Sequence, residues 1–258
     1  MKRFTALLTF AVIAILATAH GQTKSVESRI FTASSGLSIP YRISLPAGDV
    51  KDRPLLLFLH GAGERGNDNV SQLKHGQELL LNSPELEYVI VLAPQCPQEG
   101  WWVEADHPTS PEDRAVRTFP LNPILSYPLR AVKELVDSLV SSGAADPQRL
   151  YCTGLSMGGM AALDMMLRWP DLFAAVEPIC SAVNIRRLEL YEGHTAVRLF
   201  HGECDSTVPV HFSREAYDIL KKKGLDVEYI EYQETWHNSW DKAFAESDFL
   251  SWMLSRHK

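Results

Sequence analysis

The stretch that decides the fold is CTGLSMGGM, residues 152–160, in which a serine lies between glycines. Residues 149–153 are mostly apolar and predict a buried strand, while residues 157–168 predict a helix. Such a tight passage from strand to helix strains the serine backbone and leaves no room beside it, which suits Gly154 and Gly158. The helix N-terminus would point its amides at the serine oxygen. We therefore predict a nucleophile at Ser156 beside a site for an oxyanion.

Further apolar runs on both sides of this stretch alternate with segments of helical pattern. A run that is apolar at every position is typical of a strand covered on both faces, and strands alternating with helices predict a parallel sheet. The expected strands are 55–59, 88–93, 149–153, 174–179, 197–201 and 227–232, and the expected helices are 70–82, 123–141, 157–168, 213–223 and 241–256. We expect an α/β fold with a doubly wound, mostly parallel sheet and helices on both faces. Residues 28–32 and 38–44 predict an antiparallel hairpin at its edge.

The first 21 residues have the pattern of a secretory signal peptide. Lys2 and Arg3 precede an apolar run over residues 6–17, and small residues follow at Ala19 and Gly21. The run is too short for a membrane span, and no cysteine follows closely to carry a lipid, so we expect no membrane anchor. The sequence predicts export to the periplasm or the medium and one mature domain, residues 22–258.

The composition and net charge of the chain limit the kinds of molecule that it is expected to bind. The chain has 258 residues, of which 45% are hydrophobic and 22% charged, enough apolar content for one large core. Without the signal peptide, 23 Lys and Arg face 32 Asp and Glu, a formal charge of −9. A protein of this charge is expected to avoid nucleic acid and anionic membranes. The oligomeric state stays open.

The four cysteines, Cys96, Cys152, Cys180 and Cys204, are far apart in the sequence and form no Cys-x-x-Cys pair. This spacing does not predict a metal site. Cys152 and Cys180 lie in apolar runs expected to be core, where a free cysteine behaves as a small hydrophobic residue. We expect no obligatory disulfide.

Polar segments follow the expected strands at the edge where a doubly wound sheet binds its ligand. They are HGAGERG at 60–66, PQCP at 94–97 with Trp101 and Trp102 in the loop after it, GLSMG at 154–158, HGECD at 201–205 and TWHN at 235–238. Serine, then acid, then histidine is the order of the catalytic triad in α/β-hydrolases.

These segments together resemble the phospholipase/carboxylesterase branch of the α/β-hydrolase superfamily, over roughly residues 54–237. The likeness is greatest to exported bacterial esterases and "predicted peptidases" related to feruloyl and acetyl-xylan esterases. The resemblance implies Ser156 as nucleophile, Asp205 as triad acid and His237 as general base. It also implies the amides of Ala62 and Met157 as the oxyanion hole, and no metal or organic cofactor.

Alternatives exist for the acid, since Glu203 and Asp226 also lie near the expected strand ends. Asp205 is favoured because Val208 and Pro209 after it read as a loop turning into the next helix. Among the other histidines, we expect His60 to brace the oxyanion loop and His201 to pack beneath the site.

The substrate is the least constrained expectation. Gln95, Trp101 and Trp102 belong to the long loop 94–120, where an indole could lie along the cleft and contact an aromatic acyl group or a sugar ring. The paired tryptophans could equally be a hydrophobic plug over the sheet. We expect short acyl or hydroxycinnamoyl esters of carbohydrate as substrates. A serine peptidase with the same triad and a non-catalytic carbohydrate-binding protein are the alternative functions.

Overall fold

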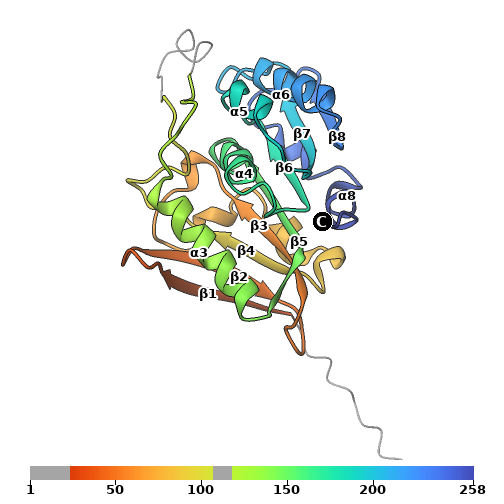
Figure 1. Ribbon diagram of the computed structural model, residues 1–258. Coiled ribbons are helices and arrows are strands. Elements are labelled where there is room, and N and C mark those ends of the chain that lie inside the picture. The colour runs from red at the N-terminus through yellow and green to blue at the C-terminus, as the bar shows by residue number, and fades with distance from the viewer. Residues whose placement is uncertain (1–23, 107–117) are drawn as a thin grey trace, which may run out of the picture.

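The computed structural model describes residues 24–106 and 118–258, which form one eight-stranded sheet with helices on both faces (Figure 1). The strands are β1 Ser25–Thr32, β2 Ser38–Leu45, β3 Arg53–Leu59, β4 Ile90–Pro94, β5 Ala145–Leu155, β6 Ala175–Ile179, β7 Ala196–Gly202 and β8 Val227–Tyr232. Their order across the sheet is β1-β2-β4-β3-β5-β6-β7-β8. The six strands β3 to β8 form a parallel sheet. Strand β2 is antiparallel to both β1 and β4. The α/β fold with its edge hairpin is confirmed.

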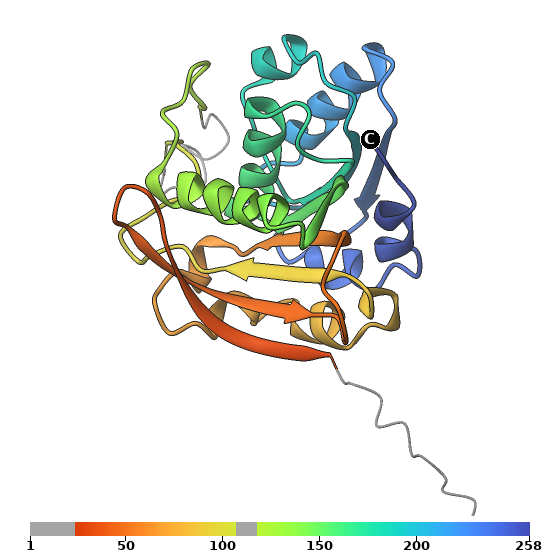
Figure 2. The same cartoon turned by 60° about the horizontal axis from the view of Figure 1, so that its bottom comes forward.

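The helices divide between the two faces of the sheet. They are α1 Gln77–Asn82, α3 Tyr127–Ser141, α4 Met157–Arg168, α5 Ile185–Glu189, α6 His211–Lys222, α7 Trp240–Ala243 and α8 Phe249–Leu254, with 3₁₀ turns η1 Ala62–Glu64, η2 Ser71–Leu73 and η3 Pro84–Leu86. Side chains of α3, α4, α5 and α6 share one hydrophobic core, and those of α1 and α8 share the other. Figure 2 shows α3 on one side of the hairpin edge and α1 on the other.

Strand β3 shows why its sequence is apolar throughout. Leu55, Leu57 and Leu59 point into the first core, and Leu56 and Phe58 point into the second. All five side chains are buried because successive residues of a strand face opposite sides. The parallel centre of the sheet therefore requires an unbroken apolar run.

Two expected helices are shorter than their sequence patterns. Residues 70–82 form η2 and α1, separated at Gly76, where the chain passes close to Phe58 and Leu80. Residues 241–256 form α7 and α8, and the break brings Phe244 and Phe249 together with ring centroids 5.4 Å apart. Packing of these rings on one core outweighs continuous helical hydrogen bonding.

One strand and one helix begin a few residues later than the sequence pattern predicts. The strand expected at residues 88–93 begins instead at Ile90, since Tyr88 is 61% exposed. The helix expected from residue 123 begins at Tyr127, because the Ser126 hydroxyl accepts a hydrogen bond from the Leu129 amide at 3.2 Å and caps the helix.

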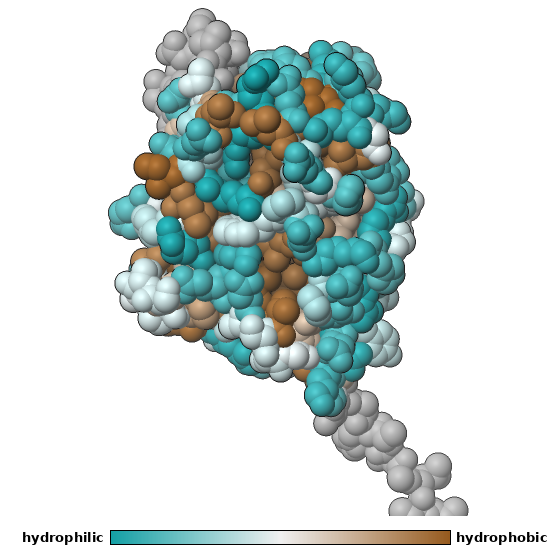
Figure 3. All heavy atoms as spheres, in the orientation of Figure 1, coloured by the Kyte–Doolittle hydropathy of each residue, from teal (hydrophilic) through white to brown (hydrophobic). Residues whose placement is uncertain are grey.

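The surface in Figure 3 is mostly hydrophilic, with apolar side chains gathered near the middle of that face. No helix within residues 24–106 and 118–258 is long and apolar enough to cross a membrane. The expected signal peptide and the middle of the 94–120 loop lie outside the described residues, so export stays a prediction. The four cysteines are free thiols.

Candidate active site

Ser156 occupies the turn between β5 and α4 with a backbone that few non-glycine residues adopt, φ 53° and ψ −117°. Its amide donates to the Ile179 carbonyl at 2.9 Å, which fixes the turn to the neighbouring strand. A Cβ atom at Gly158 would lie 1.8 Å from the Leu59 carbonyl oxygen, and one at Gly154 would lie 2.6 Å from the same oxygen. Both glycines are therefore required for the strand, turn and helix to pack this closely.

His237 connects this serine to an acid. Its Nε2 lies 2.9 Å from the Ser156 Oγ, and its Nδ1 lies 2.7 Å from the Asp205 Oδ2. A carboxylate only accepts, so Nδ1 carries the proton and Nε2 of the neutral ring is free to accept the serine proton. The structure brings together three residues that are 81 and 32 positions apart along the chain. The His237 side chain is 23% exposed, which leaves this end of the chain of hydrogen bonds open to a substrate.

Asp205 is held by both of its oxygens. Oδ1 accepts from the amides of Thr207 and Val208 at 2.8 and 2.9 Å, and Oδ2 faces both His237 and His201. Burial alone would raise the pKa of this carboxyl, but hydrogen bonds from the two histidines and the Val208 amide outweigh it and lower the pKa well below its usual range. Asp205 therefore remains ionised at neutral pH.

His201 does pack beneath the site, and it contacts the acid directly. Its Nε2 lies 2.8 Å from the Val208 carbonyl and 3.4 Å from the Asp205 Oδ2. Because a carbonyl can only accept, Nε2 carries a proton, and Nδ1 is left to bond the Ser213 hydroxyl at 2.7 Å. His201 is fully buried, so these partners fix the loop on which Asp205 lies.

The rival acids lie elsewhere. Glu203 accepts a hydrogen bond from the Glu234 amide at 3.1 Å, and Asp226 pairs with Arg256 at 3.3 Å. Neither contacts His237 in the described structure. Asp205 is the acid that the geometry joins to the histidine.

The two amides expected to form the oxyanion hole begin neighbouring turns. Met157 is the first residue of α4, whose first-turn amides have no acceptor within the helix. Ala62 is the first residue of η1. A Cβ atom at Gly61 would lie 2.8 Å from the Leu155 side chain, so this loop packs directly against the residue before Ser156.

His60 braces the oxyanion loop, as expected. Its Nδ1 donates to the Gly61 carbonyl at 2.6 Å, and its Nε2 accepts from the Cys96 amide at 2.9 Å. Acceptance from an amide requires a neutral ring. Burial lowers the pKa of His60 to about 4, and the ring is fully enclosed.

This buried histidine predicts a loss of stability in mild acid. Below pH 6.5 the unfolded chain binds a proton at His60, whereas the folded protein does not until about pH 4, so stability falls as the pH falls through this window. The contribution is on the order of 3 kcal/mol. We expect urea midpoints measured from pH 7 to pH 4 to fall more steeply for the wild type than for His60→Gln, which cannot take up this proton. Equal slopes for the two proteins would contradict the assignment.

Two of the three expected substrate-binding residues are enclosed, which corrects that expectation. Gln95 is fully buried and bonds the Asn69 amide, the Glu64 carbonyl and the Asp68 carboxylate at 2.7, 3.1 and 2.9 Å, so it holds the segment after the oxyanion loop. Trp102 is also fully buried.

The Trp102 indole N–H donates to the His60 carbonyl at 3.2 Å. Trp102 therefore matches the alternative expectation of a hydrophobic plug over the sheet. Trp101 is half-buried, with the Arg65 guanidinium 3.9 Å from its ring centre. Arg65 also donates to the Ala62 carbonyl at 2.9 Å, so Trp101 lies on the oxyanion-loop side of the site.

Two other tryptophans flank the histidine and were given no role from the sequence. Trp236, directly before His237, is 62% exposed. Trp240 packs edge-on against the His237 ring, with centroids 5.5 Å apart. Their positions within three residues of His237 are the sequence signal that indicates this placement.

Cys180, Asp205 and His237 each place a potential metal ligand within 4.8 Å of the others. Burial raises the pKa of the Cys180 thiol far above its usual range, which disfavours the thiolate that binds metals. Asp205 and His237 already share a hydrogen bond. The donor chemistry therefore fits a hydrogen-bonded acid and base better than a metal centre.

Comparison with known proteins identifies relatives of this arrangement. A sequence profile described as Phospholipase/Carboxylesterase matches residues 43–253. NocK of Nocardia uniformis subsp. tsuyamanensis, provisionally named as an esterase, is 26% identical over 212 residues, covering 81% of this chain and 54% of NocK. A solved structure described as a thermostable esterase is 31% identical with a TM-score of 0.76, covering 90% of this chain and 63% of its own. A solved structure named as a ferulic acid esterase is 15% identical with a TM-score of 0.65, covering 90% and 98%.

These matches differ in what they establish. The chain spans about half the length of NocK and 63% of the thermostable esterase, so parts of both relatives have no counterpart here. The ferulic acid esterase, at 15% identity, supports the fold alone. The family profile, in contrast, covers most of the chain and includes the serine, the acid and the histidine. On that match, the chain belongs to the phospholipase/carboxylesterase family of α/β-hydrolases.

Proposed function

We propose that this protein is a serine carboxylic-ester hydrolase that works through an acyl-enzyme. The observation that carries the proposal is the chain of hydrogen bonds from the Ser156 Oγ through His237 to Asp205, at 2.9 and 2.7 Å. A serine hydroxyl is a weak nucleophile until a base takes its proton, and His237 has the tautomer and position to do so.

The first half of the reaction acylates the serine. As the Ser156 Oγ bonds to the ester carbonyl carbon, its proton passes to the His237 Nε2, and the carbonyl oxygen becomes an oxyanion beside the Ala62 and Met157 amides. Each such donor is worth about 3 kcal/mol in comparable sites. The carbon–oxygen bond to the alcohol then breaks, and His237 gives its proton to the leaving oxygen.

The second half releases the acid. Water attacks the acyl-enzyme carbonyl while His237 takes a proton from it, and collapse of the second tetrahedral intermediate returns that proton to Ser156. Throughout, the ionised Asp205 keeps the His237 proton on Nδ1 and stabilises the imidazolium. One water molecule is consumed for each ester cleaved, and Ser156 and His237 return to their starting protonation states.

We further propose that the natural substrates are short acyl or hydroxycinnamoyl esters of carbohydrate, met after export. The family's carboxylesterase character and the sequence pattern of a signal peptide support this narrower reading. The exposed indole beside the histidine, Trp236, could contact an aromatic acyl group or a sugar ring.

Labelling by a fluorophosphonate probe tests the reaction class. We expect covalent labelling at Ser156 and hydrolysis of p-nitrophenyl, acetyl-sugar and feruloyl esters in a panel that includes peptide amides and long-chain esters. Heat-unfolded protein, in which the hydrogen bonds are lost, is the control and should not be labelled. Preference for peptide amides would identify a peptidase. Native protein that neither reacts with the probe nor cleaves any ester would contradict the proposal.

A further inference from the structure

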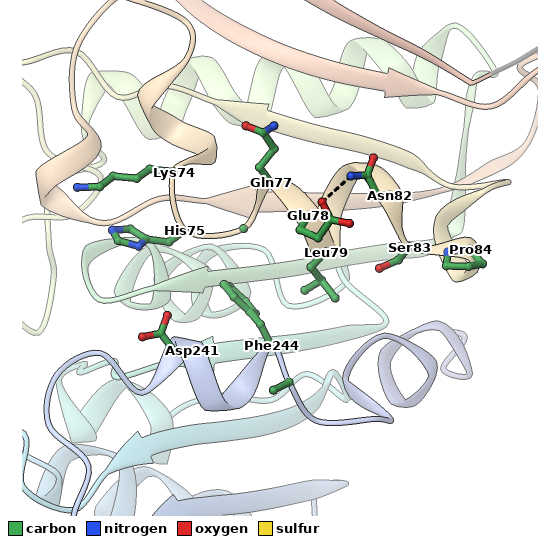
Figure 4. Close-up of a pocket in the computed structure, with 12 residues that line it drawn as sticks. Lys74, His75, Gln77, Glu78, Leu79, Asn82, Ser83, Pro84, Asp241 and Phe244 are labelled. Atoms are coloured by element: carbon green, nitrogen blue, oxygen red, sulfur yellow. Dashed lines mark hydrogen bonds between the residues drawn. The ribbon is translucent and has the colours of Figure 1, made fainter.

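A groove of about 830 Å³ lies between α1 and α7 and is lined by residues of these helices and of the chain directly next to them (Figure 4). One wall is formed by residues 74–79 and 82–84, and the other by Asp241, Phe244 and Ala245. Figure 4 shows His75 and Asp241 at one end, with Ser83 and Pro84 at the other. The reaction described above uses none of these side chains.

The His75 end of the groove adjoins the candidate active site. The His75 ring lies 5.0 Å from the Trp240 ring, and Trp240 in turn packs 5.5 Å from the His237 ring. His75 Nε2 also lies 3.3 Å from a carboxylate oxygen of Glu64, which belongs to η1, the turn that begins with Ala62. The groove therefore starts where the oxyanion loop and the histidine loop meet.

The chemistry fixes which part of an ester points this way. His237 must give its proton to the leaving alcohol oxygen, so that oxygen lies against its Nε2, and the alcohol extends past the histidine. The Trp240 and His75 rings lie in succession between the His237 ring and the groove, which His75 lines. A small alcohol would end before the groove, whereas a long one would enter it.

The lining of the groove suits a sugar. Phe244 and Leu79 supply half-buried apolar surface at its centre, against which the C–H face of a pyranose ring can pack. The exposed rim carries carboxylates at Glu78 and Asp241 and amides at Gln77 and Asn82, which can bond hydroxyl groups. Glu78 uses Oε2 to accept from Asn82 at 2.6 Å, and Asp241 uses Oδ2 to accept from Asn238 at 3.0 Å, so each keeps a second oxygen.

We propose that the groove between α1 and α7 binds the alcohol part of the substrate, and that this part is a neutral oligosaccharide. The inference rests on the proposed ester hydrolysis. It assigns His75, Glu78, Asp241 and Phe244 to substrate binding at a distance from the reacting bond. A fatty alcohol would contact Phe244 and Leu79 but would form no hydrogen bonds with the rim carboxylates and amides, whereas a sugar can use both kinds of surface.

The test compares two esters of the same acid. The double variant Glu78→Ala with Asp241→Ala should raise KM for monoacetylated xylotetraose by about fivefold or more, because hydrogen bonds to the sugar are lost. Its kcat on that ester, and both constants on p-nitrophenyl acetate, should stay within twofold of wild type. A matched control, Glu215→Ala with Asp218→Ala, removes two exposed carboxylates from α6 on the other face of the sheet and should change neither substrate.

A binding measurement separates this inference from the proposed reaction. Unesterified xylotetraose is titrated into Ser156→Ala protein, with and without the groove changes, by calorimetry. Weaker binding in the groove variant alone supports the groove, whatever the esterase result. Equal binding in both proteins, or equal KM changes on both esters, overturns the inference while leaving ester hydrolysis intact. A wild-type protein that cleaves no ester contradicts the proposed function instead.

Discussion

Replacing Ser156 with alanine should lower ester turnover by on the order of 10⁶, the loss seen when a triad serine is removed. In the proposed reaction this side chain supplies the atom that bonds to the substrate, and its Oγ is the hydroxyl that lies against the His237 Nε2. The fold should survive, since the backbone bond from the Ser156 amide to Ile179 does not depend on the side chain. Initial rates on p-nitrophenyl acetate and a thermal melt measure the two effects.

Ser181→Ala is the matched control for this prediction. Ser181 is also buried near the site, yet its hydroxyl has no hydrogen-bond partner among the described residues, so its loss should leave turnover and melting temperature nearly unchanged. If Ser156→Ala kept more than about one hundredth of wild-type turnover, the nucleophile would be another residue. A large fall in melting temperature would show that the serine is structural.

The sequence predicted the fold because its strongest signals are local and physical. Strand β3 must be apolar at every position to contact two cores, and that requirement is visible without coordinates. The glycines at 154 and 158 mark positions that tolerate no Cβ atom, so the turn that carries Ser156 is equally visible in the sequence. The order of loops along a parallel sheet then placed Asp205 and His237 at the same edge.

What the sequence missed depends on contacts between distant segments. Nothing in residues 101 and 102 indicates that one indole packs on His60 while the other lies under Arg65. The contact of Asp205 with a second histidine, His201, depends on the fold, which brings the His201 Nε2 to within 3.4 Å of the Asp205 Oδ2. The break between α7 and α8 follows from the packing of Phe244 on Phe249, which no helical periodicity shows. Two residues of that break, Phe244 and Ala245, line the groove beside α7.

Asp205→Asn should lower turnover by roughly 10⁴ without removing substrate binding. The backbone amides of Thr207 and Val208 can still donate to the asparagine oxygen, so its nitrogen takes the place of Oδ2 and meets the His237 Nδ1 proton. Two donors cannot share one bond, and the ring must move its proton to Nε2, where it can no longer accept from Ser156. We expect kcat to fall while KM for p-nitrophenyl acetate changes little.

The pH dependence of the folding stability of Asp205→Asn shows whether the variant loses the stabilising charge of the carboxylate or only its packing. In the wild type, burial would raise the pKa of Asp205, but hydrogen bonds from His201 and His237 lower it below the unfolded-state pKa of 3.8. The ionised carboxylate therefore stabilises the folded protein above pH 3.8, and this stability is lost as the pH falls toward the lower pKa of the folded state. Asp205→Asn should therefore be less stable than wild type at pH 7, and the gap should narrow in strong acid. Glu203→Gln changes a half-buried carboxylate two residues away whose hydrogen bond is to the Glu234 amide, and it should keep wild-type turnover and the same stability curve. A Glu203→Gln enzyme that lost turnover as Asp205→Asn does, or an Asp205→Asn enzyme with full kcat, would place the catalytic acid elsewhere.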